Sequence, residues 1–263
     1  IEFMLANGHC YNSRLTADRR RFEQEEEQLC KGLLQIRSQI LGNDGIRNRI
    51  IEKYKIKNVT GYSMNAFVDF DHPADIFAHL LIGGEGTLGF IVSAELNTLP
   101  LLPVYSSAML YFKDATKAAA AAAFLGESGA LSVEMMDYAA LSSLGDRPEL
   151  PGGTTAMLID YGARSSEEMQ DMIKHLGPQL KKLDGLVNLE EFTRTVNERE
   201  KLWKVRDGIF PCVAGARIPG DSVILEDVAA PVGKLDALVG GLQELFHKHG
   251  YEGSVFGHAR DGN

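Results

Sequence analysis

The sequence predicts an α+β fold in two domains, residues 1–103 and 104–263. The length of 263 residues corresponds to one large domain or two small ones. Two prolines in the segment Leu99–Pro103 remove backbone donors and stiffen the chain, which favours a boundary there. After this segment the chain contains two successive strand–helix units, an order typical of a βαββαβ, ferredoxin-like fold.

The elements expected in the first domain follow from hydrophobic spacing and turn residues. Glu2–Leu5, followed by an Asn-Gly turn, predicts a strand. Apolar residues from Phe22 to Leu41 recur at helical spacing and predict one amphipathic helix. The acidic run Glu23–Glu27 is expected on its solvated first turns, where the helix dipole favours anions. A short helix is expected to begin at Pro73, and the apolar segment Phe90–Leu99 predicts a buried strand.

The second domain is expected to mix strands and helices to its end. Short apolar runs predict strands at Ser107–Phe112, Ser132–Tyr138, Thr154–Tyr161, Ser222–Leu225 and Ser254–Phe256. Helical spacing of apolar residues, or helix-forming composition, predicts helices at Ala115–Leu125, Met169–Leu183, Val196–Asp207 and Leu235–Phe246. The alanine run Ala118–Ala123 is explained by the helix propensity of alanine, without a functional role.

Composition and charge exclude several classes of protein. Lys+Arg 27 against Asp+Glu 36 gives a net charge of −9 without a dense basic stripe, so we expect no nucleic-acid partner. The three cysteines form no CxxC pair, which excludes a local zinc or redox motif and is typical of a reducing compartment. No apolar run approaches the about 18 residues of a membrane span, and the first residues do not resemble a signal peptide. We therefore expect a cytoplasmic protein, with a peripheral position at an inner membrane as the alternative.

The segment Gly84–Gly89 satisfies the pattern G-x-G-x-x-G. The dinucleotide fingerprint also needs a helix to begin there and an acidic residue about 20 positions on, whereas here a β-prone segment follows. A phosphate-binding P-loop is excluded as well, because no Lys-Ser/Thr pair follows the glycines. Two interpretations remain: a backbone loop that approaches a ligand closely, or a tight turn between two elements. A nucleotide-phosphate binder that uses this loop alone is a further alternative.

Two separated segments carry a family resemblance. The first is IKNVTGYSMNAFVDFDHPADIFAHLLIGGEGTLGFI, which contains Asn58-Val-Thr-Gly-Tyr62 and the glycine loop. The second is Phe256-Gly-His-Ala-Arg-Asp-Gly-Asn263 at the end of the chain. Together they resemble the FAD-linked oxidases of the vanillyl-alcohol oxidase superfamily, and more narrowly the D-lactate and D-2-hydroxyglutarate dehydrogenase-like branch. The spacer DFDHPADIF is similar to that of the large, iron–sulfur-containing relatives.

The resemblance implies the identity of both domains. Residues 1–103 would be the C-terminal half of a PCMH-type FAD-binding domain, and residues 104–263 a substrate-binding cap domain truncated at its C-terminus. The chain lacks an initiator Met and ends inside a motif, so we expect an internal fragment that binds FAD poorly and is inactive alone. The residues expected to line the flavin are Asn58, Thr60, Gly61, Gly84, Glu85, Gly86, Thr87 and Gly89.

The resemblance also implies substrate-binding residues. Trp203-Lys-Val-Arg206 resembles the family's W-x-x-R, whose arginine grips the substrate carboxylate, and a planar guanidinium is suited to that because it binds carboxylates through two hydrogen bonds. Arg217 is expected to supply a second positive charge at the substrate-binding site. Two positions depart from the family pattern: Phe210 stands where a hydroxyl residue is usual, and Arg260 where a glycine is usual. In addition, the segment LEDVAAP at residues 225–231 replaces a segment that contains a lysine in the family. Without the resemblance, Arg206 reads as a helix-surface arginine.

His258 is the expected catalytic residue, because neutral imidazole can take the substrate hydroxyl proton near pH 7. In several relatives this histidine also ligates a divalent metal with residues that would lie past Asn263, so a metal role is assigned to it as well. A structural histidine near a strand end is the alternative.

The resulting hypothesis is oxidation of a D-2-hydroxy acid, D-lactate-like, to the 2-oxo acid by hydride transfer to FAD. The electron acceptor stays open, with a downstream iron–sulfur cluster as one route, and a homo-oligomer is one expected assembly. Two alternatives stay open: a non-catalytic module that retains the fold, and an oxygen-using FAD oxidase of the same superfamily acting on an alcohol or sugar.

Overall fold

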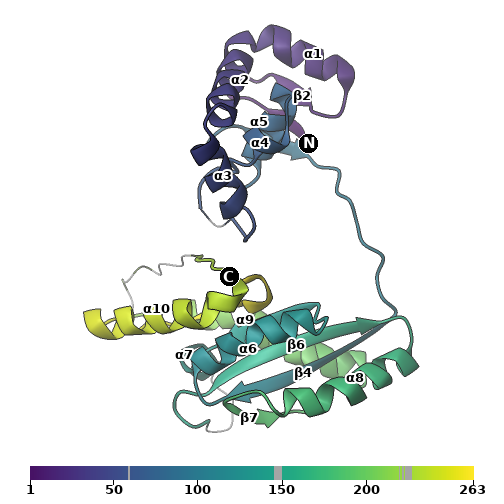
Figure 1. Ribbon diagram of the computed structural model, residues 1–263, viewed down its shortest axis with the longest axis vertical. Coiled ribbons are helices and arrows are strands. Elements are labelled where there is room, and N and C mark those ends of the chain that lie inside the picture. Colours follow the sequence, from purple (N-terminus) through teal and green to yellow (C-terminus); the bar gives the residue numbers. More distant parts are fainter. Residues whose placement is uncertain (59, 145–149, 219, 221, 223–226) are drawn as a thin grey trace. The chain divides into compact units, whose positions relative to one another are not determined.

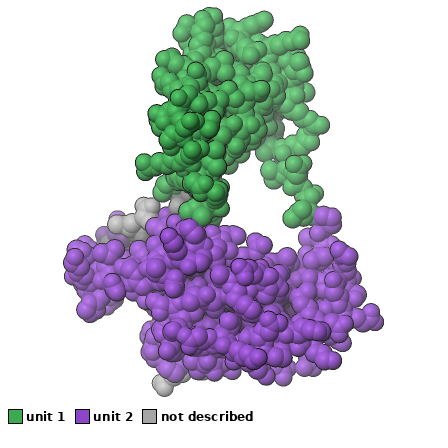
Figure 2. All heavy atoms as spheres, in the orientation of Figure 1, with its two compact units in different colours: residues 1–99 green, residues 100–263 purple. Residues whose placement is uncertain are grey.

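The computed structural model describes the whole chain except residues 59, 145–149, 219, 221 and 223–226. It divides into two compact units, Ile1–Leu99 and Pro100–Asn263 (Figure 2). Between residues 94 and 103 the chain has no regular structure over most of its length, and its leucines Leu96, Leu99 and Leu101 are 78–90% exposed. The strand expected at Ser222–Leu225 falls mostly outside the described residues.

In its described residues unit 1 contains a small antiparallel sheet and five helices, α1 to α5 in Figure 1. The strand order is β2-β1-β3. The strands are β1 (Glu2–Met4), β2 (Cys10–Asn12) and β3 (Phe90–Ser93), and the helices are α1 (Thr16–Glu25), α2 (Glu27–Leu41), α3 (Asp44–Lys53), α4 (Ala66–Asp69) and α5 (Pro73–Leu81). The rings of Phe3, Tyr11, Phe22 and Phe77 are buried against one another, with centroids 5.1–5.9 Å apart, and form the centre of the core.

Two predictions for unit 1 are wrong. The helix expected over Phe22–Leu41 is two helices, α1 and α2, which meet at Glu26, where the backbone (φ −114°, ψ 39°) is not helical. The strand expected to be buried after the glycine loop is the exposed strand β3, in which Phe90 is 69% exposed. Among the described residues β3 lies at the edge of the sheet, pairs with β1 and contributes no side chain to the core of unit 1, so it stays exposed.

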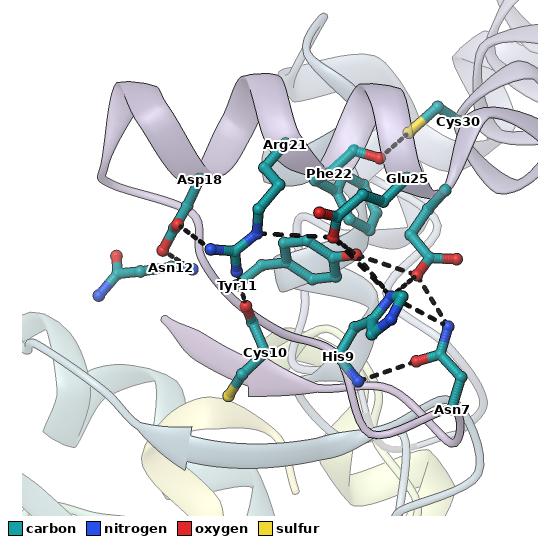
Figure 3. A network of polar contacts seen from close by, with 11 residues as sticks. Asn7, His9, Cys10, Tyr11, Asn12, Asp18, Arg21, Phe22, Glu25 and Cys30 are labelled. Atoms are coloured by element: carbon teal, nitrogen blue, oxygen red, sulfur yellow. Dashed lines mark hydrogen bonds and ion pairs between the residues drawn. The ribbon is translucent and has the colours of Figure 1, made fainter.

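Hydrogen bonds from Asn7, His9 and Tyr11, which are labelled in Figure 3, hold the break at Glu26. Asn7 Nδ2, His9 Nδ1 and the Tyr11 hydroxyl lie 2.8, 2.9 and 3.0 Å from Oε1 of Glu26. Within the acidic run Glu26 is the exception: its side chain is only 14% exposed, whereas Glu23, Glu25 and Glu27 are exposed as predicted. Burial alone raises the pKa of Glu26, but the hydrogen bonds from Asn7, His9 and Tyr11 outweigh it and lower the pKa overall.

Glu26 should therefore contribute stability that disappears in acid. Because its pKa is lower in the folded state, its contribution is complete above the unfolded value of about 4.3 and is lost as the pH falls through the folded value. We expect Glu26→Gln to flatten the acid limb in urea unfolding measured across this pH range. Glu27→Gln is the matched control, because Glu27 is exposed and, among the described residues, its ion pair is with Lys31 on the next turn of the helix. Equal acid limbs for the wild type and Glu26→Gln would contradict the expectation.

The described residues of unit 2 form a five-stranded antiparallel sheet with the order β7-β4-β6-β5-β8. Its strands β4, β6 and β7 are labelled in Figure 1. Its strands are β4 (Val104–Phe112), β5 (Ser132–Met136), β6 (Thr155–Ala163), β7 (Leu186–Leu189) and β8 (Phe256–His258). Its helices are α6 (Ala115–Glu127), α7 (Tyr138–Ser142), α8 (Ser166–Leu180), α9 (Val196–Gly215) and α10 (Leu235–His249), with 3-10 turns η1 (Val232–Lys234) and η2 (Ala259–Asp261). The run β4-α6-β5-α7-β6-α8-β7 is the predicted βαββαβ arrangement with the short helix α7 inserted between β5 and β6. No helix in the described part of the chain is long and apolar enough to cross a membrane.

Alternation along the strands divides unit 2 into two cores. Leu110 and Phe112 of β4 enter a core to which α6, α8 and α10 contribute, whereas Met109 enters a second core together with Leu141 of α7 and Ile209 of α9. The strand residues that share a face with Met109 therefore face α9.

The alanine run of α6 is buried as well as helical. Ala118, Ala119, Ala121 and Ala122 are at most 6% exposed, and α6 packs against both the sheet and α10. Helix propensity alone does not explain the run, because small side chains are needed where these layers meet.

Enlarging one of these alanines should destabilise unit 2. We expect Ala122→Leu to lower the free energy of unfolding by about 1–3 kcal/mol, the usual range for overpacking a core. The control is Ala120→Leu on the exposed side of the same helix, with an expected change within about 0.5 kcal/mol. Urea unfolding followed by circular dichroism measures both, and a tolerated Ala122→Leu would show that the layers have room to move apart.

Candidate active site

The strand register of unit 2 brings His258 beside a buried glutamate. His258 of β8 lies directly across from Glu134 of β5, and opposed residues of an antiparallel pair point to the same face of a sheet. His258 Nδ1 is 3.0 Å from Glu134 Oε1 and 2.9 Å from Oε2. The Glu134 side chain is 5% exposed and that of His258 is 51% exposed, so the carboxylate is inside while the imidazole reaches solvent.

Helix α9 brings Arg206 to the same carboxylate. The helix begins after a capping box in which Thr195 and Glu198 bond each other's backbone N–H. Arg206 Nε donates to Glu134 Oε2 at 2.9 Å, and its guanidinium lies 5.7 Å from the centre of the Phe256 ring. The structure thus brings together Arg206, which is expected to bind the substrate carboxylate, and His258, which is expected to take the proton of the substrate hydroxyl.

Glu134 itself was missed by the sequence-based assignment. Its Oε1 also accepts a hydrogen bond from the Ser132 hydroxyl at 2.6 Å. Burial alone raises the pKa of Glu134, but the hydrogen bonds from His258, Ser132 and Arg206 outweigh it, so the pKa is lowered. One signal could have revealed it: a single acidic residue within the apolar strand Ser132–Met136 needs partners if that strand is buried.

A second buried carboxylate on the same sheet face is bound in a similar way. Asp160 of β6 is 4% exposed. It accepts hydrogen bonds from Arg199 Nε at 2.9 Å and Nη2 at 2.7 Å, and from the Ser107 hydroxyl at 2.6 Å. Arg199 precedes Arg206 by seven residues, about two turns of α9, so both arginines lie on its sheet-facing side. The sequence did not reveal this pair either.

Arg217 is not part of the Glu134 cluster in the structure. Its Nη1 donates to the backbone oxygen of Ala214 at 2.6 Å. It follows Arg206 by eleven residues, about 16 Å at the rise of a helix. Of the two positions that depart from the family pattern, Phe210 is 44% exposed, and Arg260 Nε donates to the backbone oxygen of Ala130 at 2.8 Å. Arg260 therefore anchors η2 to the segment before β5.

The glycine loop of unit 1 joins α5 to β3 and contains three residues with positive φ. These are Gly83 (75°), Glu85 (50°) and Gly86 (73°), and positive φ at a non-glycine residue such as Glu85 is uncommon. A Cβ added to Gly83 or Gly86 would meet no atom within 4 Å, so the backbone there is open. β3 rather than a helix follows at Phe90, which confirms that the loop is no dinucleotide fingerprint.

Gly84 and Gly89 are closely packed instead. A Cβ on Gly84 would lie 3.0 Å from the Leu80 carbonyl oxygen, and one on Gly89 would lie 2.9 Å from the Met4 carbonyl oxygen. These two glycines therefore hold the loop against α5 and β1, while Glu85, Gly86 and Thr87 are exposed.

A neighbouring turn reaches the glycine loop through Tyr62. Its hydroxyl lies 2.8 Å from Thr87 Oγ1, which in turn donates to the Gly84 carbonyl oxygen at 2.5 Å. In that turn Asn58 Nδ2 donates to the Gly61 carbonyl oxygen at 3.4 Å, and Thr60 is exposed. Unit 1 thus brings the residues expected to line the flavin together on two linked loops.

The described residues include no group of three or more His, Cys, Asp or Glu side chains placed to hold a metal ion. At His258 the neighbouring carboxylate is that of Glu134. The metal role assigned to His258 therefore stays a prediction.

Comparison with known proteins places these residues in a family context. Residues 103–263 match the family model of FAD linked oxidases, C-terminal domain. The mitochondrial D-lactate dehydrogenase [cytochrome] of Kluyveromyces lactis is 24% identical over 222 residues, which are 79% of this chain and 35% of that protein. The D-2-hydroxyglutarate dehydrogenase of Pantoea ananatis is 23% identical over 82% of this chain and 23% of that protein. That of Stutzerimonas stutzeri is 24% identical over 81% of this chain and 43% of that protein.

The chain spans less than half the length of each of these relatives. The family model covers more than half of the chain, and the relatives bear the two names of the branch that the motifs resemble. The predicted resemblance is thereby confirmed. The chain belongs to the FAD-linked oxidases and carries their C-terminal domain in unit 2.

Proposed function

We propose that the protein containing this chain is an FAD-dependent dehydrogenase that oxidises a D-2-hydroxy acid, D-lactate-like, to the 2-oxo acid. The observation that carries the proposal is the meeting of Arg206 and His258 on Glu134, from α9 and β8. Oxidation of a 2-hydroxy acid requires a cation that binds the carboxylate and a base that accepts the hydroxyl proton, and Arg206 and His258 are groups of these two kinds. The names of the relatives support the same reaction class.

In the proposed mechanism Arg206 binds the substrate carboxylate. The Arg206 side chain is 15% exposed, and among the described residues its Nη1 and Nη2 have no hydrogen-bond partner, so both can donate to a carboxylate. This contact fixes C2 and its hydroxyl relative to His258, and fixed geometry is itself a large contribution to rate. Arg217 is proposed as a second positive charge for a substrate with a further acidic group.

His258 is proposed to receive the hydroxyl proton at Nε2. Its Nδ1 faces Glu134, so Nε2 is the nitrogen left on the outer side of the ring. Deprotonation of the hydroxyl assists loss of the hydrogen from C2 as the carbonyl of the 2-oxo acid forms.

Residues 1–103 are proposed to be the C-terminal half of a PCMH-type FAD-binding domain and residues 104–263 the cap. The open, positive-φ backbone at Gly83, Glu85 and Gly86 fits close approach of a flat ligand. The residues that would hold FAD are those of the two linked loops: Asn58, Thr60, Gly61, Gly84, Glu85, Gly86, Thr87 and Gly89. Bound FAD supplies the two-electron acceptor that amino-acid side chains do not offer.

The test uses the intact protein with its flavin. We expect D-2-hydroxy acids, and not their L enantiomers, to bleach the flavin absorption band under anaerobic conditions and to reduce an added dye. A flavin-loaded protein that no D-2-hydroxy acid bleaches would overturn the proposal. Hydrogen peroxide release with alcohols or sugars would favour the oxidase alternative, and intact protein without flavin would favour the non-catalytic module.

A further inference from the structure

Glu134 is the acceptor for every donor that meets at the candidate site. It is buried at 4% exposure, and its two oxygens lie 2.6–3.0 Å from Ser132 Oγ, His258 Nδ1 and Arg206 Nε. A guanidinium has no acceptor atom, so the carboxylate bound to Arg206 Nε is the accepting partner, and it accepts from the Ser132 hydroxyl as well. All three neighbours must therefore donate.

The need to donate to Glu134 determines which tautomer the neutral His258 ring adopts. A donating Nδ1 carries the proton, and in the neutral ring Nε2 then has the free lone pair. The same carboxylate holds the ring where its outer edge is half exposed. A histidine without this partner would divide its population between two tautomers and several ring orientations, and only one of them presents a basic Nε2 outward.

The contact with Glu134 also fixes the orientation of the Arg206 guanidinium. The contact with Glu134 uses Nε, on the inner edge of the guanidinium. Stacking on Phe256 limits rotation of the same group. Because Nε is the atom bound to Glu134, the donors of Nη1 and Nη2 are left for a second, incoming carboxylate.

We propose that Glu134 is a positioning residue for the reaction inferred above, on which this inference rests. By binding His258 through Nδ1 and Arg206 through Nε at once, it fixes the relative position of the proton acceptor and the carboxylate clamp. It does so from inside the sheet, without contacting the substrate.

The Asp160–Arg199 pair provides a matched control within the same unit. It too is a buried carboxylate that accepts from a serine hydroxyl and from an arginine of α9, but no histidine contacts it among the described residues. Loss of either carboxylate should lower stability in a similar way, because each leaves an α9 arginine unpaired. Only the Glu134 variant should affect the reaction.

The experiment compares Glu134→Gln, Glu134→Asp and Asp160→Asn in the intact, flavin-loaded protein. We expect Glu134→Gln to lower kcat by roughly 10²-fold, the usual effect of misplacing reacting groups by about 1 Å, because its amide –NH₂ faces groups that themselves donate. Binding of oxalate, a non-reacting dicarboxylate, should weaken less than kcat falls. Glu134→Asp keeps the charge and should recover part of kcat. Asp160→Asn should lower the melting temperature and leave kcat unchanged.

A second readout does not depend on turnover. In protein labelled with ¹⁵N-histidine, the His258 signals, identified by their loss in His258→Gln, should show the Nδ1–H tautomer in the wild type and a mixture in Glu134→Gln. Unchanged kcat and an unchanged tautomer in Glu134→Gln would overturn the positioning role while leaving the proposed reaction standing. Equal losses of kcat in Glu134→Gln and Asp160→Asn would also overturn it, since both effects would then be structural. Wild-type protein that holds flavin but oxidises no D-2-hydroxy acid would overturn the proposed function. In that case the tautomer still tests the contact: loss of the Nδ1–H tautomer in Glu134→Gln would show that Glu134 orients the His258 ring, whatever the reaction.

Discussion

Arg206→Ala in the intact protein is expected to lower kcat/KM for a D-2-hydroxy acid by roughly 10³-fold, equivalent to about 4 kcal/mol. The substitution removes the guanidinium edge that would bind the substrate carboxylate. It also removes one donor from the buried Glu134, so the free energy of unfolding should fall by up to about 3 kcal/mol. Steady-state kinetics and urea unfolding on the same preparation measure both effects.

Arg206→Lys separates these two effects. The lysine keeps a positive charge beside Glu134 and should recover most of the lost stability. Its single ammonium cannot form the two parallel hydrogen bonds of a guanidinium, so kcat/KM should stay about 10–100-fold below the wild type. Unchanged turnover in Arg206→Ala would remove Arg206 from the substrate site and reduce it to a structural partner of Glu134.

Asp137→Ala is expected to lower the free energy of unfolding by about 3 kcal/mol through the loss of a helix cap and of buried hydrogen bonds. Asp137 is buried, and its Oδ1 caps α7 by accepting from Ala140 N at 2.9 Å. The same carboxylate accepts from Ser254 Oγ at 3.0 Å and Val255 N at 2.8 Å, just before β8. Losing it should loosen the strand that carries His258, visible as faster hydrogen exchange of the β8 amides.

Asp114→Ala is the control for the cap alone. Asp114 begins α6 by accepting from Lys117 N at 2.8 Å and Thr116 Oγ1 at 2.7 Å, both within that helix start. Its loss should cost about 1 kcal/mol and leave exchange in β8 unchanged. Equal effects of the two substitutions would show that Asp137 does not hold β8.

Local patterns in the sequence predicted the elements that depend on near neighbours. The βαββαβ run in unit 2 follows from hydrophobic spacing, and the strand after the glycine loop follows from its β-branched residues. The failures involve partners that are distant in the chain. The helix break at Glu26 depends on Asn7, His9 and Tyr11, and spacing within the helix carries no information about them.

The candidate site divides in the same way. Arg206 and His258 lie in segments that resemble family motifs, so they could be singled out from the sequence. Glu134 lies in no such segment, and its importance appears only when the register of β5 with β8 and the position of α9 are known. Strand pairing brings His258 to Glu134 and helix packing brings Arg206 to it, and the spacing of residues along the sequence reveals neither contact.

The two contacts of Glu134 close very long loops, of 72 residues to Arg206 and 124 residues to His258. Contacts between distant parts of a chain form slowly, because loop closure must precede the gain from the contact. During refolding the sheet centre and α6 should therefore appear well before the arginine and the histidine meet. Recovery of ligand binding should lag behind recovery of the far-ultraviolet dichroism signal, and a population stopped between the two would have a formed sheet without a working site.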